Sequence, residues 1–216
     1  MSRPTHTEDD MTNPAIDMAR RSLRHLLAAL LAATIAAPAA AFTPDETAWI
    51  ETINDFAADV ADMGVPISIA VIKDADDKTS PVSMAWMGGR CVFIVSAAGN
   101  SYSQEVQRYA RSAATARLAA VAHEYWHCLQ VRGIERGDAD MPPVRSPQAE
   151  AMADAFAVLW IYCTHPDRYR DALAFFRKLR SHSPSGMYSM SGSAIDEAAE
   201  KAERGHSCSK QTVGAV

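Results

Sequence analysis

The residues best suited to chemistry lie near the middle of the chain, in the motif His123-Glu124-Tyr125-Trp126-His127. Two histidines four residues apart on a helix lie one turn apart on the same face, so both imidazoles can reach one metal ion. Nitrogen–metal bonds of about 2.0–2.1 Å suit Zn²⁺. The glutamate between them is not a ligand, but it lies beside the metal and can take a proton from water. The motif therefore predicts one zinc ion with Glu124 as a general base.

The segments on both sides of this motif predict a buried helix. Residues 119–122, together with Cys128 and Leu129, include no charged residue and no proline. A helix that carries a metal in the core of a domain needs such flanks. The alternative is a buried helix whose histidines only form hydrogen bonds with the backbone, because buried imidazoles need polar partners in either case.

Two histidines leave a tetrahedral zinc site one protein ligand short, so a third is expected further along the chain. Gln130 and Gly133 stand where a metzincin has glycine and histidine, which excludes that family. Gly133 is instead predicted to end the helix in a left-handed conformation. A second helix is predicted to begin at Ser146 and Pro147, which are favoured at the N-cap and the first helical position.

Two carboxylates on this second helix extend the pattern. Glu150 lies in its first turns, and Asp154 lies one turn later on the same face. H-E-x-x-H followed by E-x-x-x-D on the next helix resembles the gluzincin families of metallopeptidases. The resemblance implies zinc ligands at His123, His127 and Glu150, Glu124 as the catalytic base, and Asp154 as a carboxylate that holds a ligand histidine by its other ring nitrogen.

Other readings of these carboxylates stay open. Asp138 and Asp140 lie where an aspzincin places its third ligand, although the Gly-Thr-x-Asp pattern of that family is absent. Acids are also favoured near a helix N-terminus, so Glu150 and Asp154 could instead lie on an exposed helix face.

Together these residues predict a zinc-dependent peptidase that acts on a peptide or protein. Glu124 would take a proton from the zinc-activated water and pass it to the leaving amine. The oxyanion of the tetrahedral intermediate needs a further donor, for which Tyr188, His182 and His165 are candidates. The alternatives are a catalytically silent, partner-binding zinc module of the same fold and a hydrolase of cell-wall peptide links. An intact Glu124 argues against the silent module.

The first 41 residues are predicted to be an N-terminal extension with a signal peptide. Basic residues between positions 20 and 25 precede an apolar run from Leu26 to Ala37. This run of about 12 residues is too short to span a bilayer, and a small-x-small pattern follows it and ends at Ala41. Cleavage there would make Phe42 the first residue of a mature chain without membrane insertion. A Sec signal is favoured, and the Arg-Arg pair makes the twin-arginine route the alternative.

The amino-acid composition indicates which partners and which cellular compartment to expect. The net charge is −5 and no basic cluster is present, so nucleic acid is not an expected partner. Four cysteines, an even number, predict up to two disulfides in an oxidising compartment. A periplasmic or secreted protein is therefore expected. Cys128 is predicted to be a disulfide partner or a buried thiol rather than a zinc ligand.

The order of elements over residues 42–216 predicts a single α+β domain of zincin-like form, with a small sheet, the H-E-x-x-H helix and a helical half. The predicted elements are a helix from Thr43 to about Met63 ended by Gly64, a strand over 67–73, a hairpin over 82–87 and 90–95, a helix in two pieces from Ser101 to Arg132, the Glu150 helix to about Cys163, and helices over 166–180 and 193–204. Residues 91–95 could form the sheet edge that binds an extended substrate, or an ordinary central strand.

Overall fold

The computed structural model describes residues 42–73, 80–96, 107–182, 186–205 and 208. The chain divides into two units, Met1–Ala41 and Phe42–Val216, and every described residue belongs to the second. These residues contain five α-helices and one three-stranded sheet. The predicted α+β class is therefore confirmed.

The sheet consists of β1 (Ile67–Val71), β2 (Val82–Met87) and β3 (Arg90–Val95), in the order β1-β3-β2. β3 is parallel to β1 and antiparallel to β2. Gly88 and Gly89 join β2 to β3 with φ angles of 57° and 76°. Positive φ at both positions is typical of the two-residue turn that matches strand twist, so the predicted hairpin is confirmed at these residues.

The position of β3 corrects one expectation. Residues 91–95 were predicted as the possible sheet edge, but β3 lies between β1 and β2 and pairs with both. Its main-chain groups are therefore committed to its neighbours, and among the described residues β2 is the edge strand on that side. β3 is central because it also pairs in parallel with β1, which precedes the hairpin, and a hairpin pattern in the sequence does not reveal this pairing.

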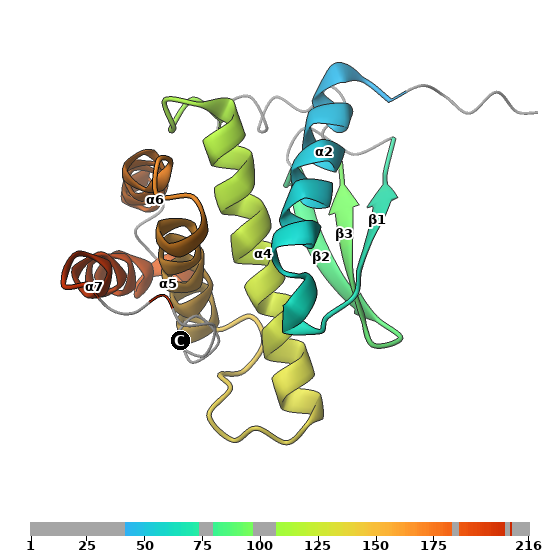
Figure 1. Cartoon of the computed structure of the whole chain (residues 1–216). Coiled ribbons are helices and arrows are strands. Elements are labelled where there is room, and N and C mark those ends of the chain that lie inside the picture. The colour runs from blue at the N-terminus through green and yellow to red at the C-terminus, as the bar shows by residue number, and fades with distance from the viewer. Residues whose placement is uncertain (1–41, 74–79, 97–106, 183–185, 206–207, 209–216) are drawn as a thin grey trace, which may run out of the picture. The chain divides into compact units, whose positions relative to one another are not determined.

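The helical elements are α2 (Pro44–Asp59), the 3₁₀ turn η1 (Ala61–Met63), α4 (Ala113–Glu135), α5 (Pro147–Thr164), α6 (Tyr169–His182), the 3₁₀ turn η2 (Gly186–Tyr188) and α7 (Ser191–Glu203). α4 packs against α2 and β2 on one side and against α5 and α6 on the other (Figure 1). The helix that carries the H-E-x-x-H motif is therefore the centre of the domain. No helix among the described residues combines the length and apolar composition that crossing a membrane requires.

Side-chain caps fix where the helices begin. Thr43 and Glu46 form a complete capping box at α2, and Ser112 and Ser146 accept a backbone N–H at the starts of α4 and α5. Cap and first-turn residues thus set the register of both helices that carry the candidate ligands. The helix expected to start at Ser101 has its beginning outside the described residues.

Gly133 has a different role from the one predicted. α4 continues to Glu135, so Gly133 lies inside the helix, and Gly137 has the left-handed conformation with φ 79°. A Cβ atom on Gly133 would lie 2.8 Å from Cγ of Met141. The glycine therefore lets the Met141 side chain of the loop after α4 pack closely against the helix, and it does not end the helix.

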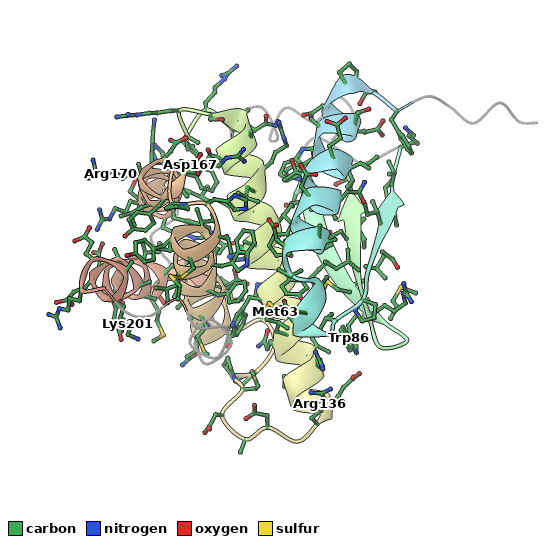
Figure 2. The ribbon with its side chains drawn as sticks, viewed as in Figure 1. Met63, Trp86, Arg136, Asp167, Arg170 and Lys201 are labelled. Atoms are coloured by element: carbon green, nitrogen blue, oxygen red, sulfur yellow. A yellow bond between two sulfur atoms is a disulfide. The ribbon has the colours of Figure 1, made fainter. Side chains whose placement is uncertain are left out.

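Aromatic rings join the layers of the core. Phe56 of α2 is fully buried, and its ring centroid lies 5.1 Å from that of Tyr125 on α4 and 4.6 Å from that of Trp160 on α5. It also contacts the ring of Phe93 on β3. Such edge-on and tilted pairs stabilise a core beyond the area they bury. The rings fill the interior, whereas Arg136, Arg170 and Lys201 lie at the outside (Figure 2).

Two disulfides connect parts that are distant in sequence. Cys91 of β3 is bonded to Cys128 of α4, and Cys163 of α5 is bonded to Cys208, which follows α7. The prediction of two disulfides is confirmed, as is the pairing role of Cys128. Disulfides persist in oxidising compartments, so the pair is compatible with an extracellular protein.

Candidate metal centre

The two histidines of the motif bring their Nε2 atoms together on one face of α4. His123 and His127 are one turn apart, and their Nε2 atoms are 3.3 Å from each other. His123 is 8% exposed, so this face of the helix is almost closed to solvent. Two ring nitrogens this close can bond each other or bind one shared partner.

Glu150 completes a group of three at the start of α5. Its Oε2 lies 3.3 Å from Nε2 of His123, and its Oε1 lies 3.6 Å from Nε2 of His127. The carboxylate reaches this point because Ser146 caps the helix and Pro147 begins it, so Glu150 falls in the first turn. Among the described residues, these three form the group of His, Cys, Asp and Glu side chains that could hold a metal ion.

The donor set fits a tetrahedral metal. With bonds of about 2.0–2.1 Å, neighbouring ligand atoms in such a site are about 3.3–3.4 Å apart. The 3.3 Å between the two Nε2 atoms matches one edge of that tetrahedron, and each Nε2 has one oxygen of the Glu150 carboxylate at 3.3 or 3.6 Å. Two imidazoles and one carboxylate are also a donor set typical of zinc, and they leave the fourth position to a water molecule or a substrate.

The other ring nitrogen of His123 is bonded to a buried carboxylate. Nδ1 of His123 donates to Oδ1 of Asp154 at 2.8 Å, and Asp154 is 0% exposed. This bond leaves Nε2 as the nitrogen that faces the group of three. Asp154 is thus located where the gluzincin resemblance implies, and such a bond fixes tautomer and ring orientation.

His127 has a partner that the sequence reasoning missed. Its Nδ1 lies 3.1 Å from Oε1 of Gln130, and Nε2 of Gln130 donates to the carbonyl of Pro142 at 2.8 Å. Since the amide N–H of Gln130 is committed to Pro142, its oxygen accepts from the imidazole. The available signal was a glutamine one turn after His127 in an otherwise apolar run.

Arg180 of α6 is the second missed residue. Its Nε and Nη2 donate to Oδ2 and Oδ1 of Asp154, both at 2.6 Å, and its side chain is 10% exposed. Its guanidinium carbon lies 3.9 Å from the ring centroid of Tyr188. No sequence motif marks Arg180, because only the packing of α6 beside α5 brings it to Asp154.

No protein-family model, no curated protein and no solved structure matches this chain. The gluzincin resemblance therefore rests on the motif residues.

The remaining candidates from the sequence lie in different places. Asp138 and Asp140 are exposed in the loop after α4 and are not part of the group of three. His165 pairs with Asp59 at 3.0 Å, beyond the far end of α5 from Glu150. His182 bonds the carbonyl of Lys178 through Nδ1 at 2.7 Å.

A small pocket opens beside Glu124. Its volume is about 90 Å³, and its lining includes His123, Glu124, Arg180 and Tyr188, with apolar walls from α6. His182 is not among the residues that line it. Of the donor candidates named from the sequence, Tyr188 is the one that shares a cavity with Glu124.

The free edge of β2 runs along this pocket. The carbonyl of Pro81 accepts from the N–H of Ser96, so its main-chain groups face β3. Alternation along the strand turns those of Val82 and Met84 outward. Accordingly, Val82 accepts from Ser80 Oγ, and the main chain of Met84 lies close enough to the Glu124 carboxylate to lower its pKa, against the larger effect of burial. The candidate base is thus a neighbour of the edge strand.

Burial and neighbouring charge shift the protonation of the group in the metal-free chain. Burial raises the pKa of Glu124 to about 7. Burial also opposes the charge on His123, but its bonds to Asp154 and Glu150 outweigh this and raise its pKa to about 9. Burial and the charge of His123 lower the pKa of His127 to about 4. For Asp154, the bonds with His123 and Arg180 outweigh burial and lower the pKa to about 2.

Proposed function

We propose that this chain is an exported, zinc-dependent peptidase of zincin-like form. The observation that carries the proposal is the convergence of His123, His127 and Glu150: the two Nε2 atoms are 3.3 Å apart, and each lies 3.3 or 3.6 Å from a Glu150 carboxylate oxygen, close to the separations in a tetrahedral zinc site. The second ring nitrogen of each histidine is bonded to a side-chain oxygen, as expected of metal ligands.

The chain's own residues divide the work of hydrolysis. A zinc ion, when bound, would polarise the substrate carbonyl and lower the pKa of a water molecule. Glu124, which lies beside the main chain of Met84, takes the proton of the attacking water on its carboxylate and passes it to the leaving amine. Tyr188 is the candidate donor to the developing oxyanion, since it lines the same pocket.

An extended peptide is the substrate that this surface favours. In the described residues β2 pairs with β3 alone, and its outward main-chain groups lie beside Glu124. An edge strand can bind any peptide backbone by main-chain hydrogen bonds. The pocket of about 90 Å³ beside it has apolar walls from Phe175, Phe176 and Leu179, so a small apolar side chain is expected there.

The compartment follows from the two disulfides and the predicted signal segment. Both disulfides need an oxidising environment to persist, and a periplasmic or secreted location supplies one. The silent zinc module predicted as the alternative would need the three ligands but would have no use for a carboxylate at Glu124.

The test is metal analysis and a peptide-library assay on residues 42–216, with and without a chelator. About one zinc per chain and chelator-sensitive cleavage are expected. Glu124→Gln should keep the zinc and lose cleavage by several orders of magnitude, because an amide cannot accept the proton. His123→Ala should lose the zinc, whereas His165→Ala, a histidine paired with Asp59, should keep it.

The possible results of these experiments test different parts of the proposal. Full zinc occupancy in His123→Ala would disprove the metal site. Undiminished cleavage by Glu124→Gln would disprove the role of the base. One zinc per chain without cleavage of any library peptide would favour the binding module.

A further inference from the structure

A buried carboxylate at the start of α2 has one oxygen without a partner. Glu46 is 0% exposed. Its Oε2 accepts from the backbone N–H of Thr43 and from Nζ of Lys73, both at 2.7 Å. Its Oε1 is buried and accepts no hydrogen bond from any described residue. Buried polar atoms in folded proteins are nearly always bonded, so this oxygen points to a further donor.

Phe42 is the residue next to the one whose main-chain nitrogen already bonds Glu46. It precedes Thr43, whose own nitrogen is bonded to Glu46, and consecutive residues are about 3.8 Å apart. Nζ of Lys73 lies 4.7 Å from the centroid of the Phe42 ring. Phe42, Lys73 and Glu46 therefore form one cluster at the first residue of the folded unit Phe42–Val216.

Phe42 is also the residue that would begin the mature chain if the signal segment were cleaved at the small-x-small pattern. The pattern ends at Ala41, and the boundary between the two units falls at the same bond, Ala41–Phe42. In the uncut chain the nitrogen of Phe42 is a neutral amide with a single N–H.

We propose that the chain is hydrolysed between Ala41 and Phe42, and that the buried Glu46 carboxylate binds the new α-ammonium group of Phe42. Water adds across the peptide bond, which leaves a carboxylate on Ala41 and a protonated amine on Phe42. This proposal rests on the proposed export only for the cut itself. It needs neither the metal nor catalysis by this chain.

Charge and the number of N–H donors favour the ammonium group of Phe42 as the partner of Glu46 Oε1. An ammonium group brings three N–H donors and a positive charge to a carboxylate that has an unused oxygen. The N-terminus of a helix disfavours a cation, but Asp45 and Glu46 place two acidic residues in the first turn of α2. The competing occupant is a water molecule, which would bond Oε1 equally well before and after the cut.

The experiment compares residues 42–216 with residues 40–216 in the same buffer, once with added zinc and once with a chelator. The longer chain differs only by the native Ala40-Ala41, which moves the ammonium group away from Glu46. Residues 42–216 should be more stable, by about tenfold in the unfolding equilibrium constant, as for a hydrogen bond between charged groups. In the Glu46→Gln background the two lengths should be equally stable, because the amide carries no charge.

Lys73→Met is the matched control. It removes the other cation on Glu46 but leaves Oε1 in place, so the difference between the two lengths should persist or grow. Equal stability of the two wild-type lengths would overturn the proposal and favour a water molecule at Oε1. A difference that survives Glu46→Gln would overturn it as well. If the intact mass of the exported protein showed a first residue other than Phe42, the proposed cleavage site would be wrong.

Discussion

Gln130 links a candidate metal ligand to the loop that follows its own helix. Its Oε1 accepts from Nδ1 of His127 at 3.1 Å, while its Nε2 donates to the carbonyl of Pro142 at 2.8 Å. Gln130 is 0% exposed, so neither bond competes with water. The orientation of one histidine ring is therefore coupled to the path of the chain toward Glu150.

Gln130→Met should weaken zinc binding by roughly 10–100-fold, because methionine keeps the length of the side chain but cannot accept from the imidazole. Competition against a chromophoric chelator measures the affinity. Gln148→Met, at an exposed glutamine near the start of α5, is the matched control and should bind zinc as the wild type does. Equal affinities for all three proteins would mean that Gln130 only fills space.

Gly133→Ala should have opposite effects in two backgrounds. The new Cβ would lie 2.8 Å from Cγ and 2.9 Å from Cε of Met141, so overpacking should cost about 1–3 kcal/mol in the wild type. In Met141→Ala that contact is gone, and the helix preference for alanine should stabilise the fold by up to about 1 kcal/mol. Urea unfolding of the four proteins measures the coupling. A cost that is the same in both backgrounds would place the strain elsewhere.

The features that could be predicted from the sequence depend on residues close together in the chain. Caps at Thr43 and Ser146 are short-range signals, and so are the glycines of the hairpin and the ligand spacing on α4, whereas the cap of α4 at Ser112 was not predicted. Each depends on residues within one or two turns of one another. The three candidate ligands could be predicted for the same reason. The position of Glu150 on its helix is set by the N-cap Ser146, only four residues before it.

The features that the sequence did not predict depend on contacts between segments that are distant in the chain. β3 became the central strand because β1 pairs with it in parallel, and Arg180 reaches Asp154 from 26 residues away. The disulfide pairing of Cys91 with Cys128 likewise depends on how β3 packs against α4. No periodicity encodes these contacts.

Acid should destabilise the fold partly through Glu46. Burial alone would raise the pKa of this carboxyl, but the bonds from Lys73 and Thr43 outweigh it and hold the pKa below 4.5. A carboxyl whose folded pKa is lowered stabilises the fold above its unfolded pKa, and this stabilisation is lost as the pH falls through the folded pKa. Glu46→Gln should therefore lose less stability than the wild type between about pH 6 and pH 3.

Urea unfolding of both proteins at several pH values in this window makes the comparison. Glu51→Gln, at an exposed carboxyl on the same helix, is the control and should follow the wild-type curve. Parallel curves for wild type and Glu46→Gln would show that the ion pair with Lys73 does not contribute to acid stability.

Arg180→Met should destabilise the protein more than any surface ion pair could. It removes both 2.6 Å bonds to Asp154 and leaves that 0% exposed carboxylate with His123 as its remaining partner. Breaking one side of a buried pair costs about 3–5 kcal/mol. Arg177→Met is the matched control on the same helix, because its bonds to Asp196 are exposed and should contribute at most about 1 kcal/mol. If urea unfolding gave equal losses for the two variants, Arg180 would not be the counter-ion that holds Asp154 against the ligand histidine.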